Sequence, residues 1–247
     1  MDTIFGIDGC KSGWFVAQSQ DNKTINFMLI ESLDSINDFT KKSAVVGIDI
    51  PLELHEKGTR MAEKEARLFL GRRASTIFSP PAIKTLNAKT YFDACRINYN
   101  VEGKKISKQT WHIFNKIKEA RKIYLDKASN KKLFEIHPEL SFMAMNHMQV
   151  LIDSKKTIEG RKKRLKLING YYPFFSFDDV RGKFSSKDVA DDDILDAIAV
   201  LWSTQKIIDN IASYVPKKPE TSKSKICLLY TSPSPRDQRG SRMPSSA

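Results

Sequence analysis

The stretch TIFGIDGCKSGWFVAQS, residues 3–19, holds two short apolar runs on either side of a glycine-containing turn. Ile4–Asp8 and Gly13–Ser19 each have the length of a strand, and Thr24–Ile30 forms a third run. Short apolar runs separated by turn residues are typical of strands that pair with their neighbours in sequence. The sequence therefore predicts a three-stranded meander at the start of the chain.

A fourth strand is indicated by Ala44–Ile50, an uninterrupted apolar run that ends before Pro51. Such a run is typical of a strand that is buried on both faces, so we expect it near the centre of a sheet. Lys132–Ile136 is a further strand candidate. Pro138 suits the first position of the helix that we expect after it.

Helical spacing dominates residues 56–131, which we interpret as a helical insertion in this sheet. Within it, Met61–Leu70 is expected to end at Gly71, and Ser107–Leu125 carries apolar residues at helical intervals. Three other helices are expected, at Ser35–Thr40, Thr157–Ile168 and Asp188–Asp209. The pattern as a whole predicts one α/β domain over residues 1–216, with a mixed sheet flanked by helices.

Composition favours an ordinary globular protein. Hydrophobic residues make up 40% of the 247, which is ample for a core, and no apolar run approaches the ~20 residues that cross a bilayer. The three cysteines form no CxxC pair, so neither a disulfide framework nor a zinc site is indicated, and we expect a cytoplasmic location. The net charge of +12 favours a polyanionic partner.

Residues 217–247 differ in composition from the rest of the chain. They are rich in Pro, Ser, Lys and Arg without hydrophobic periodicity, which predicts a disordered tail. The stretch CLLYTSPSPRDQRGSRMPSSA within it resembles translated sequencing-adapter read-through. We therefore interpret the tail as an artefact.

Four aspartates stand in apolar surroundings: Asp8 and Asp49 at expected strand ends, and Asp193 and Asp196 in ADDDILDAIAVLW. Three residues apart on a helix, Asp193 and Asp196 share one face. Carboxylates in apolar settings are costly unless a cation neutralises them, and Mg²⁺ and Mn²⁺ prefer such ligands. We interpret all four as one metal site; the alternative is that they are turn and helix-capping residues.

Glu135 and His137 alternate in FEIHPE and would face the same side of a strand. They are candidates to ligate metal or to orient water as catalytic groups. The alternative for His137 is that it only precedes the helix that begins at Pro138.

Several basic or hydroxyl side chains are candidates for phosphate contact. Lys11 and Ser12 lie in the turn after Asp8, and Arg72 and Arg73 follow Gly71 in an expected loop. A run of cations around the expected basic helix would suit a nucleic-acid backbone, although such runs are also common on solvated faces. The candidates in that run are Lys155, Lys156, Lys162, Lys163 and Arg164.

Six motifs together give the chain a resemblance to a known family. They are FGIDGCKSGWFVA, GIDIPL, GRRASTIFSPP, FEIHPELSF, SKKTIEGRKKRL and ADDDILDAIA. In this order they resemble the DUF429 family of predicted ribonuclease H-like nucleases, and DILDAIA is also similar to the helix motif of RuvC-type Holliday-junction resolvases. The resemblance spans roughly residues 3 to 210.

The resemblance implies a ribonuclease H-like mixed sheet and a metal-dependent nuclease activity. By it, Asp8, Asp49 and Asp193 would be metal ligands and Asp196 an additional one, with Mg²⁺ or Mn²⁺ as the cofactor. Nucleic acid would be the partner, whether DNA or RNA.

Two other functions fit the same motifs. Actin-like ATP phosphotransferases also begin with a strand that ends in Asp before a glycine-containing turn, but they need a second such turn, which the sequence lacks. A non-catalytic nucleic-acid-binding module on the same fold is the other alternative. Intact acids argue against it, because binding a polyanion is better served by Asn or Lys at those positions.

Overall fold

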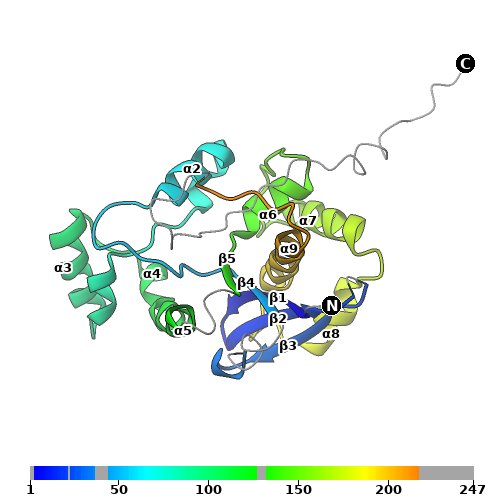
Figure 1. Cartoon of the computed structure of the whole chain (residues 1–247), viewed down its shortest axis with the longest axis horizontal. Coiled ribbons are helices and arrows are strands. Elements are labelled where there is room, and N and C mark those ends of the chain that lie inside the picture. The colour runs from blue at the N-terminus through cyan, green and yellow to red at the C-terminus, as the bar shows by residue number, and fades with distance from the viewer. Residues whose placement is uncertain (1–2, 22, 37–43, 127–131, 217–247) are drawn as a thin grey trace, which may run out of the picture.

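The computed structural model of the chain describes residues 3–21, 23–36, 44–126 and 132–216, and the fold is built on a five-stranded mixed sheet (Figure 1). Its strands are β1 (Thr3–Cys10), β2 (Gly13–Ser19), β3 (Asn26–Ile30), β4 (Ala44–Ile48) and β5 (Leu133–Glu135), in the order β3-β2-β1-β4-β5. The first three strands are antiparallel neighbours, whereas β4 and β5 run parallel to β1. The α/β class and the initial meander are confirmed.

The parallel register brings two of the candidate acids side by side. Asp8 lies inside β1, opposite Phe15, rather than at the strand end as expected. β4 ends at Ile48, which pairs with Ile7, so Asp49 is the first residue beyond it. The Asp49 amide still donates to the Ile7 carbonyl at 2.9 Å, so Asp8 and Asp49 leave adjacent strands at the same edge of the sheet.

All the remaining elements are helical. Between β4 and β5 lie α2 (Met61–Leu70), η1 (Gly71–Thr76), η2 (Ile83–Asn87), α3 (Tyr91–Glu102), α4 (Lys108–His112) and α5 (Phe114–Leu125). After β5 come α6 (Pro138–Met145), α7 (Ile158–Tyr171), α8 (Phe177–Lys183) and α9 (Asp191–Ile208). None of the helices within the described ranges is long and apolar enough to cross a membrane.

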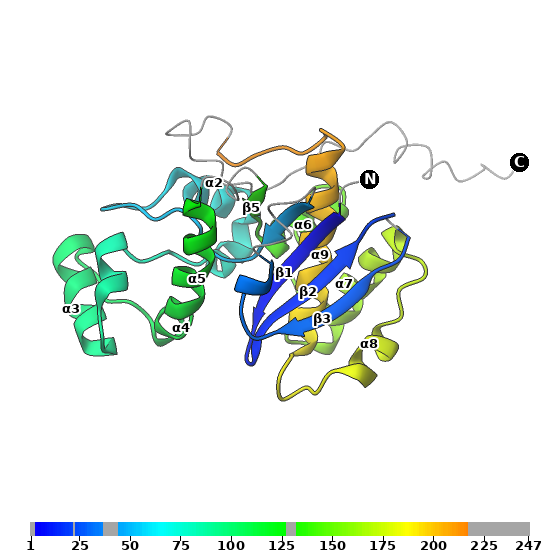
Figure 2. The same cartoon turned by 60° about the horizontal axis from the view of Figure 1, so that its bottom comes forward.

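The two faces of the sheet are covered by different helices (Figure 2). On one face α9 packs across β1, β2 and β4, with Ile194 and Leu201 in a core shared with Ile4. On the other face Ile117 and Ile123 of α5 pack in the core that contains Phe5 and Ile7. Alternate side chains of β1 thus pack into two separate cores, as expected of a strand that is buried on both faces.

Two glycines let α9 approach the sheet closely. A Cβ atom at Gly6 would stand 2.2 Å from the Ala197 carbonyl oxygen, and one at Gly47 would stand 2.2 Å from Oγ1 of Thr204. Both distances are far below normal contact, so only glycine fits at these positions. The close packing brings the N-terminal half of α9 to the edge of the sheet where Asp8 and Asp49 lie.

Some expectations need correction. The single helix expected over Ser107–Leu125 is broken at Ile113 into α4 and α5, and α3 and α8 were not expected. β5 ends at Glu135, so strand alternation does not extend to His137. The helix expected at Ser35–Thr40 lies for the most part outside the described residues, as does the whole of the tail, 217–247.

Candidate active site

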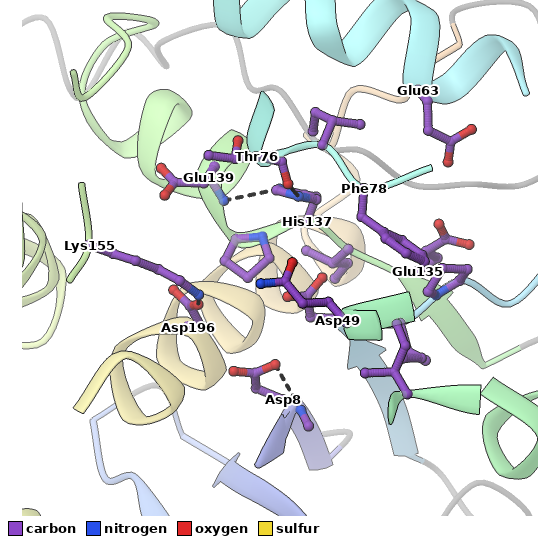
Figure 3. A pocket seen from close by; sticks show the side chains of 18 of the residues that line it. Asp8, Asp49, Glu63, Thr76, Phe78, Glu135, His137, Glu139, Lys155 and Asp196 are labelled. Carbon is purple, nitrogen blue, oxygen red and sulfur yellow. Dashed lines mark hydrogen bonds and ion pairs between the residues drawn. The ribbon is translucent and has the colours of Figure 1, made fainter. Parts of the chain in front are cut away.

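A cavity of about 540 Å³ opens at the carboxyl edge of β1, β4 and β5. Its walls also include residues from η1, from the loop before α7 and from α9 (Figure 3). Each of the six sequence motifs contributes at least one lining residue: Asp8, Asp49, Arg73, Glu135, Lys155 and Asp196. Segments that are far apart in the chain therefore meet at one place.

Three carboxylates from three elements point into this cavity. Asp8 comes from β1, Asp49 from the end of β4 and Asp196 from α9 (Figure 3). Asp8 accepts a hydrogen bond from the Gly9 amide at 2.8 Å. No hydrogen bond or ion pair joins the Asp49 carboxylate to another residue in the described part of the chain.

Burial and mutual repulsion make these carboxylates costly to ionise. Burial, followed by the charges of Asp49 and Asp196, raises the pKa of Asp8 well above its ordinary value. Burial likewise raises the pKa of Asp49 to about 7 and that of Asp196 to about 6. A raised carboxyl pKa means that the charged form is destabilised, so a cation at this place would be strongly favoured.

Lys155 supplies a cation to the cluster. Its Nζ lies 2.5 Å from Oδ2 of Asp196 and 3.3 Å from Oδ2 of Asp192. Burial alone would lower the pKa of the Lys155 ammonium, but Asp196, Asp8 and Asp192 outweigh burial and raise it. The residue that the sequence suggested for phosphate contact thus lies among the candidate metal ligands.

Asp193 behaves differently from Asp196. Its Oδ2 accepts the amide of Ala190 at 2.7 Å, which closes a capping interaction at the start of α9. It does not line the cavity, although its pKa is raised to about 6, first by burial. Asp193 is therefore a helix-capping residue in this structure. Of the two helix aspartates, only Asp196, one turn further along α9, remains a candidate metal ligand.

Glu135 lines the cavity but its oxygens have partners of their own. Arg60 donates to Oε1 at 2.6 Å and to Oε2 at 3.0 Å, and the Leu52 amide donates to Oε2 at 2.8 Å. Arg60 is buried and also binds Glu63. Glu135 is thus part of a buried ion-pair network on the cavity wall.

His137 occupies the cap position of α6. Its Nδ1 accepts the Glu139 amide at 3.3 Å, which leaves the Nε2 hydrogen to donate to the Thr76 carbonyl, also at 3.3 Å. Burial lowers the pKa of the ring, which favours the neutral form in this arrangement. Both ring nitrogens are engaged with backbone, in agreement with the alternative that His137 prepares the helix at Pro138.

Apart from Lys155 and Arg164, the residues expected to bind phosphate separate into three groups. Arg73 and Lys156 line the cavity, and an Arg73 Nη lies 3.6 Å from Glu139. Lys11, Arg72 and Lys162 are exposed outside it. Two others have polar partners, since Ser12 donates to Asp188 at 2.6 Å and Lys163 pairs with Asp153 at 2.6 Å.

Arg164 corrects the expectation that this residue contacts phosphate, and it does not lie on a solvated face either. Its side chain is fully buried, and its Nη2 reaches both oxygens of Glu139 at 2.8 and 2.7 Å. Its Nη1 donates to the Gly160 carbonyl at 2.9 Å. Arg164 therefore contacts no exposed phosphate; it holds α7 to α6 and supports the cavity wall.

The family model described as "Protein of unknown function (DUF429)" matches residues 6–221, which is most of the chain. The chain belongs to the DUF429 family. No curated protein and no solved structure matches it. The family resemblance seen in the six motifs is thus confirmed.

Other cavity residues of this DUF429 chain were not anticipated from the sequence. Gln109, Ile113 and Lys116 reach the cavity from α4, from the residue between α4 and α5, and from α5. Phe78 reaches it from the segment that follows η1 (Figure 3). The position of Glu139 could have been predicted from the sequence, because an acid directly after His137 and Pro138, which begin the helix, must lie in the first turn of α6. No sequence pattern indicated that α4 and α5 line the cavity, since they belong to a distant part of the chain.

The carboxylates of the DUF429 site are not arranged as a finished metal centre. Among the residues that the structure describes, no three acidic, histidine or cysteine side chains form a group that could hold a metal ion. In this arrangement the positive charge nearest Asp196 is that of Lys155. To bind a metal ion, the carboxylates would have to move closer together, and Lys155 would have to give up its ion pair with Asp196.

Proposed function

We propose that the protein is a divalent-metal-dependent nuclease on a ribonuclease H-like fold. The observation that carries the proposal is the convergence of Asp8, Asp49 and Asp196 on one cavity, from β1, the end of β4 and the last helix. The sheet supports it as well, because a meander followed by two parallel strands is the arrangement expected of that fold.

The donor set fits a hard divalent cation. Asp8, Asp49 and Asp196 offer carboxylate oxygens, the ligands that Mg²⁺ and Mn²⁺ prefer, and their raised pKa values reflect a deficit of positive charge. These three residues would hold the metal, with Asp193 available only if it leaves the helix cap. A metal bound there would supply an activated water and stabilise the leaving oxygen of a phosphodiester.

The chain itself would provide the grip on substrate. Arg73 and Lys156 line the same cavity as the acids and offer charged donors to a phosphate group. Glu135 and Arg60 fix the wall between them by their ion pair. Nucleic acid is the substrate class that this combination of acids and surrounding cations suits best.

The direct test is incubation of the purified full-length chain with labelled single-stranded, duplex and branched DNA and RNA. Cleavage of at least one substrate is expected in Mg²⁺ or Mn²⁺, and none in EDTA. Binding without cleavage in either metal would support a non-catalytic module, the function that the Lys155–Asp196 ion pair favours. Release of ADP from ATP would instead support a phosphotransferase.

Lys155→Met is expected to separate protein stability from metal affinity. Loss of the charge-assisted bond to Asp196 should lower stability in EDTA by about 1.5–3 kcal/mol. Because the ammonium no longer competes, Mg²⁺ or Mn²⁺ should raise the melting temperature more than in wild type. Thermal unfolding with and without metal measures both effects.

Lys156→Met is the matched control, since Lys156 has no ion pair with a described acid. It should change neither quantity by much. If metal shifts the melting temperature of Lys155→Met no more than that of wild type, Lys155 does not compete with a cation at this site.

A further inference from the structure

The positive charge of the chain is not distributed as the basic run in the sequence suggested. Around α7, three cations are taken up by acids: Arg161 by Asp191, Lys163 by Asp153 and Arg164 by Glu139. A fourth, Lys155, is held by Asp196. Lys156, Lys162 and Lys166 of this segment form no ion pair with a described acid, and a second group of such cations lies elsewhere in the fold.

A second hollow, of about 1150 Å³, lies along η2, α4 and α5. We call it the basic groove. Its cationic lining consists of Lys84, Lys89, Lys118, Arg121 and Lys122, with His112 beside them, and no acid is found among the described residues that line it. The groove thus concentrates positive charges, of which Asp34 compensates one, that of Lys122.

Three of these cations are available to a ligand. Lys84, Lys89 and Lys118 are exposed and form no ion pair with a described acid. The other two are engaged, since Arg121 donates to the Leu52 carbonyl at 2.5 Å and Lys122 pairs with Asp34 at 3.0 Å. Three ammonium groups around one groove suit a ligand with several regularly spaced anions.

The groove also has an apolar and aromatic part. Trp111 is half-buried there, with its ring centroid 5.0 Å from that of Phe114, and the Leu125 side chain is 63% exposed. A cationic rim beside an aromatic surface is the combination that binds single-stranded nucleic acid, because cations follow the phosphates and bases lie on aromatic rings. An acidic protein segment without apolar side chains would leave this aromatic surface uncovered.

The basic groove shares a wall with the cavity that Asp8, Asp49 and Asp196 line. Gln109, Ile113 and Lys116 of the α4–α5 region line the cavity, whereas Trp111 and Lys118 of the same region line the groove. An α-helix with its side chains is about 10–12 Å across, so the two sites are separated by little more than one helix. A strand held in the groove would therefore lie within reach of the cavity.

We propose that the basic groove binds a single-stranded segment of nucleic acid and so holds the substrate of the neighbouring cavity. The first half of this statement concerns binding alone; the second rests on the proposed nuclease function. The groove residues Lys84, Lys89 and Lys118 contact phosphates, and Trp111 contacts a base.

The experiment measures binding of labelled single-stranded DNA and RNA to the full-length chain by fluorescence anisotropy in EDTA, over a range of salt. The triple variant Lys84→Ala, Lys89→Ala, Lys118→Ala should bind on the order of tenfold more weakly at moderate salt. Its log-log salt slope should fall by about 2, since each single-strand phosphate contact contributes about 0.7.

The matched control is Lys162→Ala, Lys163→Ala, Lys166→Ala on α7, which removes the same charge from a different surface. It should leave the slope nearly unchanged. Equal slopes in the two triple variants, no binding by wild type, or tighter binding of a duplex of the same sequence would each overturn the proposal.

Tryptophan fluorescence gives a second measurement. Trp14 and Trp202 are 0% and 4% exposed, so quenching on addition of an oligonucleotide should come from Trp111 and be lost in Trp111→Phe. Quenching that persists in this variant would contradict base contact in the groove. Because EDTA excludes metal-dependent cleavage, binding and cleavage are tested separately. Binding that depends on the groove residues, without cleavage in any metal, would refute the nuclease function but leave the proposed binding groove intact. Cleavage in metal, with binding that does not depend on the groove residues, would refute the groove but leave the nuclease function intact.

Discussion

Asp8→Asn and Asp49→Asn should each reduce metal-dependent cleavage by more than about 100-fold while raising stability in the absence of metal. Groups that only surround a metal ligand already cost 10–100-fold in affinity or activity when mutated, so loss of a ligand should cost more. Neither carboxylate has an ion-pair partner among the described residues, and both have raised pKa values. Asn removes a destabilised negative charge, so the protein should unfold at higher temperature in EDTA.

Cleavage under single-turnover conditions and melting temperature in EDTA are the two measurements. Asp178→Asn is the control, because Asp178 is an exposed residue in the first turn of α8, away from the cavity. It should retain wild-type cleavage. If Asp8→Asn still cleaves at the wild-type rate, the cavity is not the site of the reaction.

The opposite signs of these two effects are informative in themselves. An acid kept only for the fold would lose stability when neutralised, as a capping or paired carboxylate does. An acid kept for metal binding is expected to gain stability, because its charge serves no purpose in the metal-free protein. Asp193 combines the two features, because it caps α9 while burial raises its pKa to about 6.

The elements that the sequence predicted well are those whose local pattern agrees with their final environment. β4 is apolar throughout because it is buried on both faces, and α2 begins at Met61 and ends at Leu70 as its pattern and Gly71 indicated. α3 was missed although Thr90 caps it and Gly103 ends it, because its apolar residues do not share one face: Phe92 and Tyr99 are exposed. The break at Ile113 carries no Pro or Gly that could have announced it.

At the candidate site, the meeting of Asp8 and Asp49 was predictable from the sequence, whereas the partners of the cations were not. The parallel pairing of β1 with β4 brings Asp8 and Asp49 to the same edge of the sheet, although Asp8 lies inside its strand. The partners of lysines and arginines depend on tertiary packing. Lys155 and Arg164 come from the same basic run, yet one lies against an acid of the cavity and the other is buried beneath α7.

Arg164→Met should be strongly destabilising, by roughly 3–5 kcal/mol, because it removes one partner of a buried ion pair. Glu139 would keep its buried charge with only Arg73, at 3.6 Å, as a cationic neighbour within ion-pair distance among the described residues. The guanidinium also lies over the ring of Phe142, 5.3 Å from its centroid, and that contact would be lost too. Urea unfolding should show a large fall in midpoint with an unchanged slope.

The adjacent residue in the sequence provides the control. Lys163 pairs with Asp153, but 46% of its side chain is exposed, so Lys163→Met should cost no more than about 1 kcal/mol. The double variant Arg164→Met, Glu139→Met should recover much of the stability lost in Arg164→Met, because no charge is then left buried without a partner. Equal, small effects of Arg164→Met and Lys163→Met would mean that Glu139 tolerates its charge without Arg164, and the wall of the cavity would then be held by other contacts.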